Sequence, residues 1–469
     1  MSKHARKSCP QCCRVQAEVK ALRAEVVELR EQLAAALKNS STSSKPPSSD
    51  IVKPPPAAAG DASGPRTIGG QPGHPKHERA PFPPEQVTHH EEHLLEACPC
   101  CGGRLCRNGH FAKVVQQVDI TRPPLTIEEH ISPEYWCAHC QRSFKAPMPA
   151  HIDKGGLAGP QLTALIAYLK GACHASFSTT RTFLRDVVGV TISRGELSKI
   201  IGKVSAALEK PYDELLALLP NEAFVNVDET GHKDNGDKWW TWCFRAALYT
   251  LYHIDAHRNA EVLMDTLGKD FGGILGCDYF SAYRRYMREC SVPLQFCLAH
   301  LIRDVKFLTT LPDTRDQQYG ESLRRALKEL FAVFHQQGEL PAKVLQARLQ
   351  AARARVVYLG LKAPATRHGQ NMAERFRKHG EAYFTFITTP GVAPTNNLVE
   401  QAIRFVVIDR HITQGTRSEG GRRWSERIWT VIATCIQQGQ SVYAFLCQAI
   451  AAWFEDRPAP SLLSTATRG

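Results

Sequence analysis

Residues 224–230, FVNVDET, join a short apolar run directly to two adjacent carboxylates. The first four residues are mostly aromatic and β-branched, which is typical of a buried strand. Asp228 and Glu229 follow the apolar run without a turn residue between them. We therefore expect a strand that ends in acids at the edge of a sheet, and the rest of the chain has to supply the reason.

The residues that follow predict a mixed sheet around this strand. Residues 239–244 (WWTWCF) and 247–254 (ALYTLYHI) have strand composition, and Gly236 supplies a turn before the first of them. A helical run over 259–271 then precedes a further strand within 272–280 (GGILGCDYF). Adjacent strands, a helix and another strand indicate an α/β sheet.

Two further acids form a candidate triad with Asp228. Asp278 follows the strand in GGILGCDYF, and Glu400 lies in the helix that opens with TNNLVEQAIR. If the two strands lie side by side, both aspartates project from one edge, and a helix packed across that edge brings Glu400 to the same point. Converging carboxylates bind hard divalent cations such as Mg²⁺ or Mn²⁺. Two such ions activate an attacking oxygen and stabilise a leaving oxygen in phosphoryl transfer.

Each acid also has a plain structural interpretation. The first aspartate closes a strand, and the second caps the next helix. Asn397 and Glu400 fit a capping box, and Glu400 is one helical turn from Arg404. Glu229 and Asp255, which ends LYHID, are rival ligands.

The composition favours a multidomain protein that acts on a polyanion. The chain has 469 residues, which suits two to four domains, and 43% of them are hydrophobic. The net charge of +12 and the pI of about 9.0 favour DNA or RNA as the partner. No apolar run reaches about 18 residues, so we expect no membrane span, and the N-terminus lacks the apolar part of a secretory signal. Sixteen cysteines without such a signal indicate a reducing compartment, where clustered cysteines bind metal.

Two cysteine pairs predict a structural zinc site. Cys98 and Cys101 form one CxxC knuckle, and Cys137 and Cys140 form another. Two such hairpins supply the four soft ligands that tetrahedral Zn²⁺ requires. The 35 residues between the knuckles exceed those of a compact ribbon, so we expect them to form a small sheet.

Other possible metal ligands lie nearby. Cys100, Cys106 and His139 are close enough in sequence to replace one of the four ligands. Cys9 and Cys12 form a third CxxC without a partner pair, and two copies in a dimer would have to share a metal.

The N-terminal region predicts self-association. Over residues 15–37 apolar residues recur at alternating spacings of four and three, with charges between them, as in a coiled coil. We therefore expect a homo-oligomer, and the alternative is one amphipathic helix packed on its own protein. Residues 41–87, rich in Ser, Pro and Gly, indicate a flexible basic linker. The seam consists of Val15, Val19, Leu22, Val26, Leu29, Leu33 and Ala36.

Residues 156–217 have helical patterns, and two amphipathic stretches meet at Gly189. Ser193 is placed to cap the second helix. This arrangement suits a helix-turn-helix, whose second helix enters a major groove, and Arg194 and Lys199 would then face DNA. An ordinary helical hairpin is the equal alternative.

Helical patterns continue over 314–385 and in a last pair of helices at 396–406 and 424–455. The C-terminal part carries a basic run that would hold a DNA backbone and make binding strongly salt-dependent. A solvated charged surface is the alternative for any one of its members. The run consists of Arg404, Arg410, His411, Arg417, Arg422 and Arg423.

These motifs, in this order, resemble the DDE transposases of the bacterial insertion-sequence-66 group, the large TnpC-type protein. The resemblance covers nearly the whole chain: the leucine-rich coil, NSSTSSKPPSSD, GGQPGHPKH, CPCCGG and YWCAHC, VDET, GCDYFSAY, FCLAHLIRD and PTNNLVEQAIR. It implies a ribonuclease-H-like core with a helical insertion before the last acid. It also implies that Asp228, Asp278 and Glu400 are the catalytic, Mg²⁺-binding residues, and that accessory proteins of the same element take part.

Three further residues have supporting roles under this hypothesis. Asn396 and Asn397 would fix the start of the helix of Glu400 or contact a phosphate. His300 of FCLAH would face the active site. A single histidine on a helix is more often packed in the core, and that alternative stays open.

We therefore predict a multidomain α/β protein with six regions. They are a coiled coil (1–40), a linker (41–87), a zinc module (88–150), a helical segment that suits a helix-turn-helix (151–219), a ribonuclease-H-like core (220–410) with a helical insertion at about 314–390, and a basic helical C-terminal region (411–469).

The leading hypothesis is a bacterial, cytoplasmic, Mg²⁺-dependent DNA transposase that also carries structural Zn²⁺. Its partners would be the terminal repeats of its element and target DNA, and it would associate with the nucleoid when bound. The core would cleave phosphodiesters at the element ends and join the freed 3′-OH to target DNA. A nuclease that only hydrolyses and a DNA-binding relic or regulator without catalysis are the alternatives.

Overall fold

The computed structural model describes the chain over residues 10–39, 42, 83–87, 100–101, 125–132, 134–137, 139, 141–145 and 147–463. The chain divides into two compact units, one formed by Met1–Pro54 with Glu128–Gly469 and one by Pro55–Ile127. The short helix η2 (Pro84–Gln86) belongs to the second unit, and every other element named below belongs to the first.

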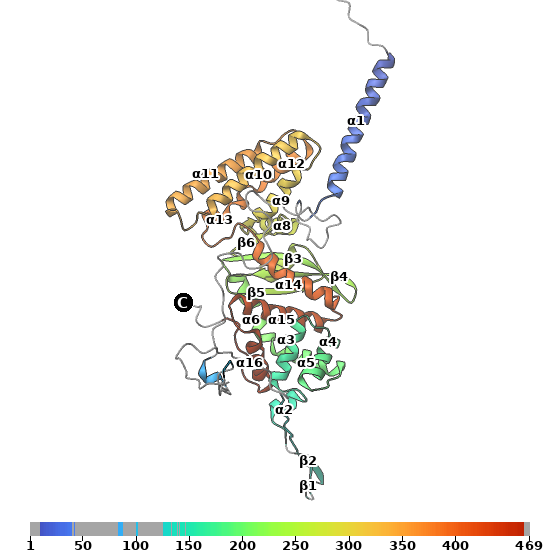
Figure 1. The fold of residues 1–469 in the computed structure, drawn as a ribbon, viewed down its shortest axis with the longest axis vertical. Helices are drawn as coiled ribbons and strands as arrows, with labels where there is room; N and C mark the ends of the chain where they lie inside the picture. Colours follow the sequence, from blue (N-terminus) through green and yellow to red (C-terminus); the bar gives the residue numbers. More distant parts are fainter. Residues whose placement is uncertain are drawn as a thin grey trace, which may run out of the picture. The chain divides into compact units, whose positions relative to one another are not determined.

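A mixed sheet of five strands lies in the larger unit (Figure 1). Its strand order is β5–β4–β3–β6–β7. The first three strands pair as antiparallel hairpins, whereas β6 and β7 continue the sheet in parallel with β3. This confirms the predicted α/β sheet and makes β3 its central strand. The strands are β3 (Phe224–Asp234), β4 (Asp237–Arg245), β5 (Thr250–Asp255), β6 (Ile274–Cys277) and β7 (Leu294–Phe296).

Helices fall into groups along the chain. Those before the sheet are α2 (Ala150–Gly155), α3 (Pro160–Gly171), α4 (Phe177–Phe183), the π-helical turn η3 (Leu184–Val188), α5 (Arg194–Ala207), α6 (Glu209–Leu218) and the short η4 (Leu219–Asn221). Those between and after the strands are α7 (Ala260–Leu267), α8 (Ser281–Cys290) and α9 (Leu298–Leu308). The insertion contains α10 (Thr314–Phe334), α11 (Ala342–Leu361), α12 (Arg367–His379), η5 (Glu381–Tyr383) and α13 (Thr385–Thr388). The last helices are α14 (Asn397–Thr413), α15 (Glu419–Gln437) and α16 (Val442–Phe454).

The sequence predicted that the first strand ends at the acids Asp228 and Glu229. In the structure, β3 continues to Asp234. Asn235 and Gly236 both have positive φ angles, 51° and 95°, and this two-residue turn leads directly into β4. Polar residues of β3 beyond Asp228 therefore pair with β4 through their backbone. The apolar pattern missed this half of the strand because its partner strand, rather than its own side chains, stabilises it.

The two aspartates of the triad nevertheless come to one place in the sheet. β3 and β6 pair in parallel up to Asn226 and Gly276. Asp228 lies two residues after Asn226 on β3, and Asp278 lies two residues after Gly276, just beyond the end of β6. The carboxylates thus lie just beyond the last parallel pair, where the sequence analysis expected them to meet.

Helices cover both faces of the sheet. Side chains alternate between faces along a strand, so Asp228 and Glu229 point in opposite directions. α14 packs on the face of Asp228, where Tyr252 Oη donates to the carbonyl of Ala402 at 2.9 Å. α8 lies on the face of Glu229, to which Tyr283 donates a hydrogen bond. The third acid of the triad, on α14, therefore approaches the sheet from the side of the first acid.

The C-terminal helices complete the sheet instead of forming a region of their own. Three helices follow the insertion where we predicted a pair, and the predicted boundary at residue 410 falls inside α14. α15 lies along the edge strand β5. There the hydroxyl of Thr430 accepts the N–H of Tyr252 at 3.0 Å. The hydroxyl of Thr434 accepts the N–H of Thr250 at 3.2 Å. α15 thus satisfies backbone groups that an edge strand would leave unpaired.

The N-terminal seam lies on one helix, α1 (Pro10–Ala36). Its apolar residues are largely uncovered in the single chain; Leu22 and Leu33, for example, are each 59% exposed. The helix is as predicted, and the second copy that would cover the seam stays a prediction. None of the helices in the described part of the chain is long and apolar enough to cross a membrane.

The second cysteine knuckle lies on a hairpin of β1 (Glu134–Cys137) and β2 (Arg142–Lys145). Cys101 is exposed, and only the backbone of Cys137 is described. Cys98 and Cys140 lie outside the described residues, as does most of the small sheet that we predicted between the knuckles. The four-cysteine site therefore stays a prediction at this level.

Candidate active site

Asp228 lies half-buried in the middle of β3, where its charge is poorly tolerated. Burial raises the pKa of its carboxyl group well above the usual value, and the negative charges of Glu229, Asp278 and Glu400 raise this pKa further. The N–H of Glu229 donates to Asp228 Oδ1 at 2.9 Å and opposes the rise only in part. The structure thus brings Asp228 within electrostatic reach of both acids that the sequence analysis grouped with it.

Asp278 follows β6 and precedes α8. Its Oδ1 accepts the N–H of Phe280 at 2.8 Å, but Phe280 is the N-cap residue of α8 and the helix has no side-chain cap, so Asp278 does not cap it as the structural alternative expected. Burial raises the pKa of the Asp278 carboxyl group to about 6, and the negative charge of Glu229 adds to the rise. The hydrogen bond from Phe280 and the charges of Arg258 and Arg375 oppose this rise only in part.

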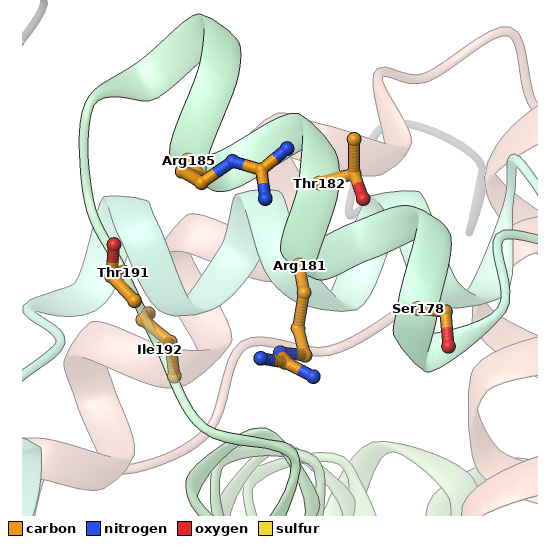
Figure 2. A pocket seen from close by; sticks show the side chains of 6 residues that line it. All are labelled: Ser178, Arg181, Thr182, Arg185, Thr191 and Ile192. Carbon is orange, nitrogen blue, oxygen red and sulfur yellow. The ribbon is translucent and has the colours of Figure 1, made fainter.

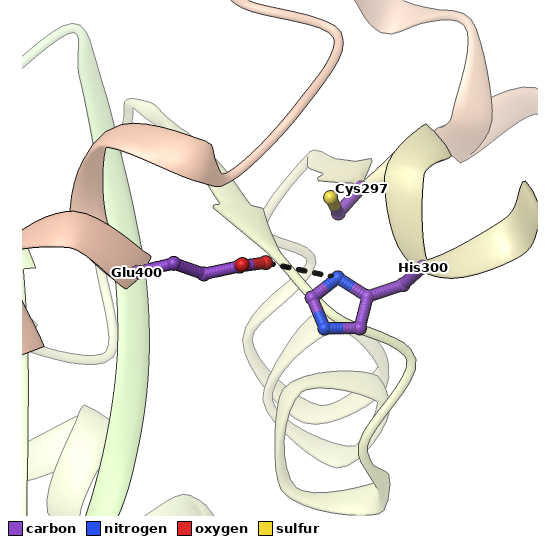
Figure 3. Close-up of side chains that lie close together, drawn as sticks. All are labelled: Cys297, His300 and Glu400. Atoms are coloured by element: carbon purple, nitrogen blue, oxygen red, sulfur yellow. Dashed lines mark ion pairs between the residues drawn. The ribbon is translucent and has the colours of Figure 1, made fainter. Parts of the chain in front are cut away.

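Glu400 lies in the first turn of α14 and reaches toward α9 (Figure 3). Both of its carboxylate oxygens lie 3.3 Å from Nη2 of Arg303, and Oε1 lies 3.5 Å from Nδ1 of His300. Within the described part of the chain its charged partner is Arg303 and His300 lies beside it, whereas Arg404 is exposed. α9 therefore orients the third acid.

Asn396 holds the start of α14 against the sheet. It is the N-cap residue, one position before Asn397, and its side chain makes no capping hydrogen bond, so the capping-box alternative is wrong. Instead Nδ2 donates to the carbonyl of Val227 at 2.7 Å, and the Asn396 N–H donates to Cys297 Sγ at 3.2 Å. Asn396 is 1% exposed. These bonds tie the helix of Glu400 to the strand residue that precedes the first acid.

A second group with the composition of a metal site consists of Cys297, His300 and Glu400 (Figure 3). One ligand atom from each lies within 4.8 Å of the others. Burial raises the pKa of the Cys297 thiol to about 11, and its sulfur already accepts a backbone N–H, which disfavours a thiolate ligand. Burial, followed by the charge of Arg303, lowers the pKa of His300 to about 3, so the imidazole is neutral at pH 7. We conclude that this group positions Glu400.

The two rival acids are engaged elsewhere. The side chain of Glu229 is 1% exposed, and its Oε1 lies 2.6 Å from Nη2 of Arg258 and 2.8 Å from Nε. Tyr283 donates to the other oxygen of Glu229. Asp255 ends β5, two strands away from β3, and accepts the N–H of His257 at 2.6 Å. Neither rival shares the face on which the triad converges.

The three carboxylates of the candidate triad come from separate elements, and no group in the described residues brings ligand atoms of all three within 4.8 Å of one another. They come from β3, from the residue after β6 and from the first turn of α14. All offer oxygen ligands, which Mg²⁺ and Mn²⁺ prefer. Burial, followed by neighbouring negative charge, raises the pKa values of Asp228 and Asp278, so the surrounding groups compensate these carboxylates incompletely.

Two of the predicted DNA-binding arginines are engaged within the fold. Arg422 pairs with Asp234, and its guanidinium group lies 4.2 Å over the ring of Trp239. Arg423 lies 2.9 Å from the buried carboxylate of Glu426. The pair with Asp234 ties Arg422 of α15 to β3, whereas Arg423 pairs within its own helix and its side chain is 46% exposed.

The remaining basic residues are more accessible. Arg410 is half-buried and donates to Thr230 Oγ1 at 3.3 Å, on the face of the sheet that carries Asp228. Its guanidinium group therefore lies on the same side as the candidate triad. The exposed members are Arg194, Lys199, Arg404, His411 and Arg417.

Sequence reasoning missed the cations near the acids. Arg303 follows His300 by three residues in FCLAHLIRD, and this spacing, which places both on one helix face, was a usable signal. Arg375, on α12 of the insertion, stacks 3.9 Å over the ring of Tyr279, the residue after the second acid. Its charge opposes the rise in the pKa of Asp278. Nothing in the sequence around Arg375 indicated this position.

The chain belongs to a known transposase family. The model of the transposase IS66 family matches residues 155–423, which is more than half of the chain. The model of the zinc-finger binding domain of transposase IS66 matches residues 96–141, a range that contains both cysteine knuckles. A family of unknown function, DUF6444, matches residues 5–80. The resemblance drawn from the motifs is therefore confirmed, and the chain is a transposase by family with a zinc-finger domain.

Two proteins of Sinorhizobium fredii are similar over most of the chain. Uncharacterized protein y4hP is 22% identical over 391 residues, which cover 76% of this chain and 70% of y4hP. Uncharacterized protein y4qI is 25% identical over 424 residues, which cover 82% of this chain and 77% of y4qI. The similarity thus extends well beyond one domain.

Proposed function

We propose that this protein is a DDE-type DNA transposase whose catalytic acids are Asp228, Asp278 and Glu400. The observation that carries the proposal is their convergence. Asp228 lies on β3, Asp278 follows the neighbouring parallel strand β6, and Asn396 ties the start of the helix that carries Glu400 to β3. Family membership supports DNA cleavage and joining over other metal-dependent chemistry.

The sheet supports a ribonuclease-H-like core. Three antiparallel strands are followed by two parallel ones, and the first acid lies on the central strand. The second acid follows the neighbouring parallel strand. The third comes from a helix that packs on the sheet after the insertion α10–α13.

In this proposal the three carboxylates hold Mg²⁺ or Mn²⁺. Such ions, when bound, activate the attacking oxygen and stabilise the leaving oxygen of an in-line displacement. The chain itself supplies positioning: Arg303 and His300 orient Glu400, and Arg258 keeps Glu229 on the opposite face. Water attacks first and frees a 3′-OH at the element end, which then attacks target DNA. Phosphoryl transfer of this kind depends on positioning and charge stabilisation and needs no covalent protein intermediate.

The other parts of the chain would bind DNA and assemble the protein. Cys98, Cys101, Cys137 and Cys140 would hold structural Zn²⁺, and the match of the zinc-finger family over residues 96–141 supports this set. The exposed seam of α1 would pair with a second copy. The protein would act on the bacterial nucleoid together with accessory proteins of its element.

The test uses the full chain with its zinc, labelled duplexes that carry both flanks of its gene, and Mg²⁺ or Mn²⁺. We expect end-specific nicking and joined products from the parent. Asp228→Asn should lose both, whereas Asp255→Asn, the same change at the rival acid, should keep them. Nicking without joining would indicate a nuclease that only hydrolyses. Specific binding without chemistry in the parent would overturn the catalytic proposal in favour of a DNA-binding relic.

A further inference from the structure

A small cavity lies between α4, η3 and the loop that leads into α5 (Figure 2). Its volume is about 170 Å³. No acidic side chain is among the residues that line it. These residues are Ser178, Arg181, Thr182, Arg185, Thr191 and Ile192.

The lining of the cavity is a set of hydrogen-bond donors. Arg181 and Arg185 supply two guanidinium groups, and Ser178, Thr182 and Thr191 supply hydroxyls (Figure 2). Guanidinium groups match the geometry of phosphate oxygens, and hydroxyl groups commonly donate to phosphates of nucleic acids. The combination fits a phosphate group better than a neutral or cationic ligand.

Both arginines are available to a ligand. Arg181 is exposed, and its side chain has no hydrogen-bond or ion-pair partner among the residues that the structure describes. Arg185 lies 2.6 Å from Asp186, its neighbour in sequence, and the two side chains are 61% and 52% exposed. Ion pairs this exposed are weak, so a phosphate can replace the carboxylate.

Local structure holds the cavity in shape. Gly189 takes a left-handed φ of 87° and ends η3. Ser193 Oγ accepts the N–H of Glu196 at 3.1 Å and caps α5, as the sequence predicted. Ile192 is buried, at 2% exposure, and anchors the loop between these two points. The π-helical turn η3 is a rare element that occurs frequently at functional sites.

We propose that this cavity binds a phosphodiester group of the DNA backbone. The inference rests on the proposed function, because it requires that the protein bind duplex DNA through the pair α4–α5. In a helix-turn-helix the first helix crosses the backbone while the second enters the groove. Arg181 and Arg185 bind one phosphate and thereby fix the position of α5 along the duplex. Arg194 and Lys199 are exposed on α5. Such a contact positions the protein without reading sequence.

The test compares two double variants of the full chain, R181A/R185A and R315A/R324A. Arg315, on α10 of the insertion, is a matched control because its side chain is also 61% exposed and pairs with a nearby aspartate, Asp313. Binding is measured by fluorescence anisotropy without divalent cation, over a range of salt, on an end-containing and a scrambled duplex. We expect R181A/R185A to bind both duplexes about tenfold more weakly and to reduce the slope of log K against log salt by about 1. The control variant should change neither the affinity nor the slope.

The possible outcomes separate the cavity from the wider proposal. R181K/R185K keeps both charges and should recover most of the binding, which excludes a folding defect. Unchanged affinity and slope in R181A/R185A would overturn the inference alone, whereas a parent that binds neither duplex would overturn the proposed function with it. A loss confined to the end-containing duplex would indicate base reading and count against a backbone contact. Inorganic phosphate that stabilises the parent but not R181A/R185A, with DNA binding unchanged, would assign the cavity to free phosphate instead.

Discussion

Two neighbouring acids of β3 have opposite surroundings. Glu229 is buried against Arg258 and Tyr283, so its charge has partners on its own face of the sheet. Asp228, one residue earlier, points to the other face, where burial and the negative charges of Glu229, Asp278 and Glu400 raise its pKa. The comparison teaches that a compensated acid stabilises the fold, whereas an uncompensated buried acid marks a site for a cation or substrate.

The largest expected effect comes from neutralising the uncompensated acid. Asp228→Asn should reduce end-specific cleavage by at least about a thousandfold, equivalent to about 4 kcal/mol of barrier. Its thermal stability should stay equal to that of the parent or rise, because the raised pKa of Asp228 shows that the fold disfavours its charge. Single-turnover cleavage and thermal unfolding measure the two quantities. Cleavage within tenfold of the parent would remove Asp228 from the site.

Neutralising the compensated acid, Glu229, should lower the stability of the fold, in contrast to neutralising Asp228. Glu229→Gln should lower the free energy of unfolding by about 2–3 kcal/mol, less than for a fully buried pair because Arg258 is 37% exposed. Urea unfolding measures the loss. Glu261→Gln is the control: Glu261 pairs with Arg285, but it is 47% exposed, so its change should stay below about 0.5 kcal/mol. Equal losses in the two variants would break the comparison.

His232, a third titratable residue on β3, extends the comparison to the pH dependence of stability. His232 is 3% exposed and makes hydrogen bonds to Thr416 and Thr241 at 3.0 and 3.3 Å. Burial lowers its pKa from 6.5 to about 4, so between these pH values the unfolded chain binds a proton that the folded chain does not. Stability should therefore fall by about 2 kcal/mol as the pH drops from about 6.5 to about 4. Urea unfolding at several pH values should show this component in the parent and not in His232→Gln, and the same pH dependence in both would assign it to other groups.

The smallest expected effect is stabilisation by the cation. Mn²⁺ at ten times its Kd should raise the free energy of unfolding by about 1.4 kcal/mol. The same addition should leave Asp228→Asn unchanged and should still stabilise Glu229→Gln, because Glu229 lies on the other face. Thermal unfolding with and without Mn²⁺ measures the shift. Stabilisation of Asp228→Asn equal to that of the parent would place the ion elsewhere.

Local elements followed from the sequence more closely than long-range ones. Ser193, for example, caps α5 as predicted, because residues adjacent in sequence define a helix cap. The second half of β3 was missed because backbone pairing with β4, and not side-chain pattern, makes it a strand. Arg422, which looked like part of a DNA-binding run, pairs in the folded chain with Asp234 of β3, a contact between distant segments that no local pattern indicates.

The candidate site shows the same division. Asp228, Asp278 and Glu400 were predicted from motifs and from the family resemblance, and their catalytic role stays a proposal. The group that orients the third acid was found only in part, because His300 was noticed and Arg303 was not. Arg375 had no signal, since it enters the surroundings of Asp278 from a helix of the insertion.

The sequence by itself determined which chemical groups this protein carries: three spaced acids, two cysteine knuckles, a heptad seam and the strands of an α/β sheet. These features are local, because composition and periodicity over a few residues define them. Only the tertiary structure decided which acid is compensated. Arg258 reaches Glu229 across 29 residues, and Arg303 reaches Glu400 across 97. Burial and charge at a carboxylate depend on neighbours from other elements, and these neighbours are set by how the sheet and helices pack.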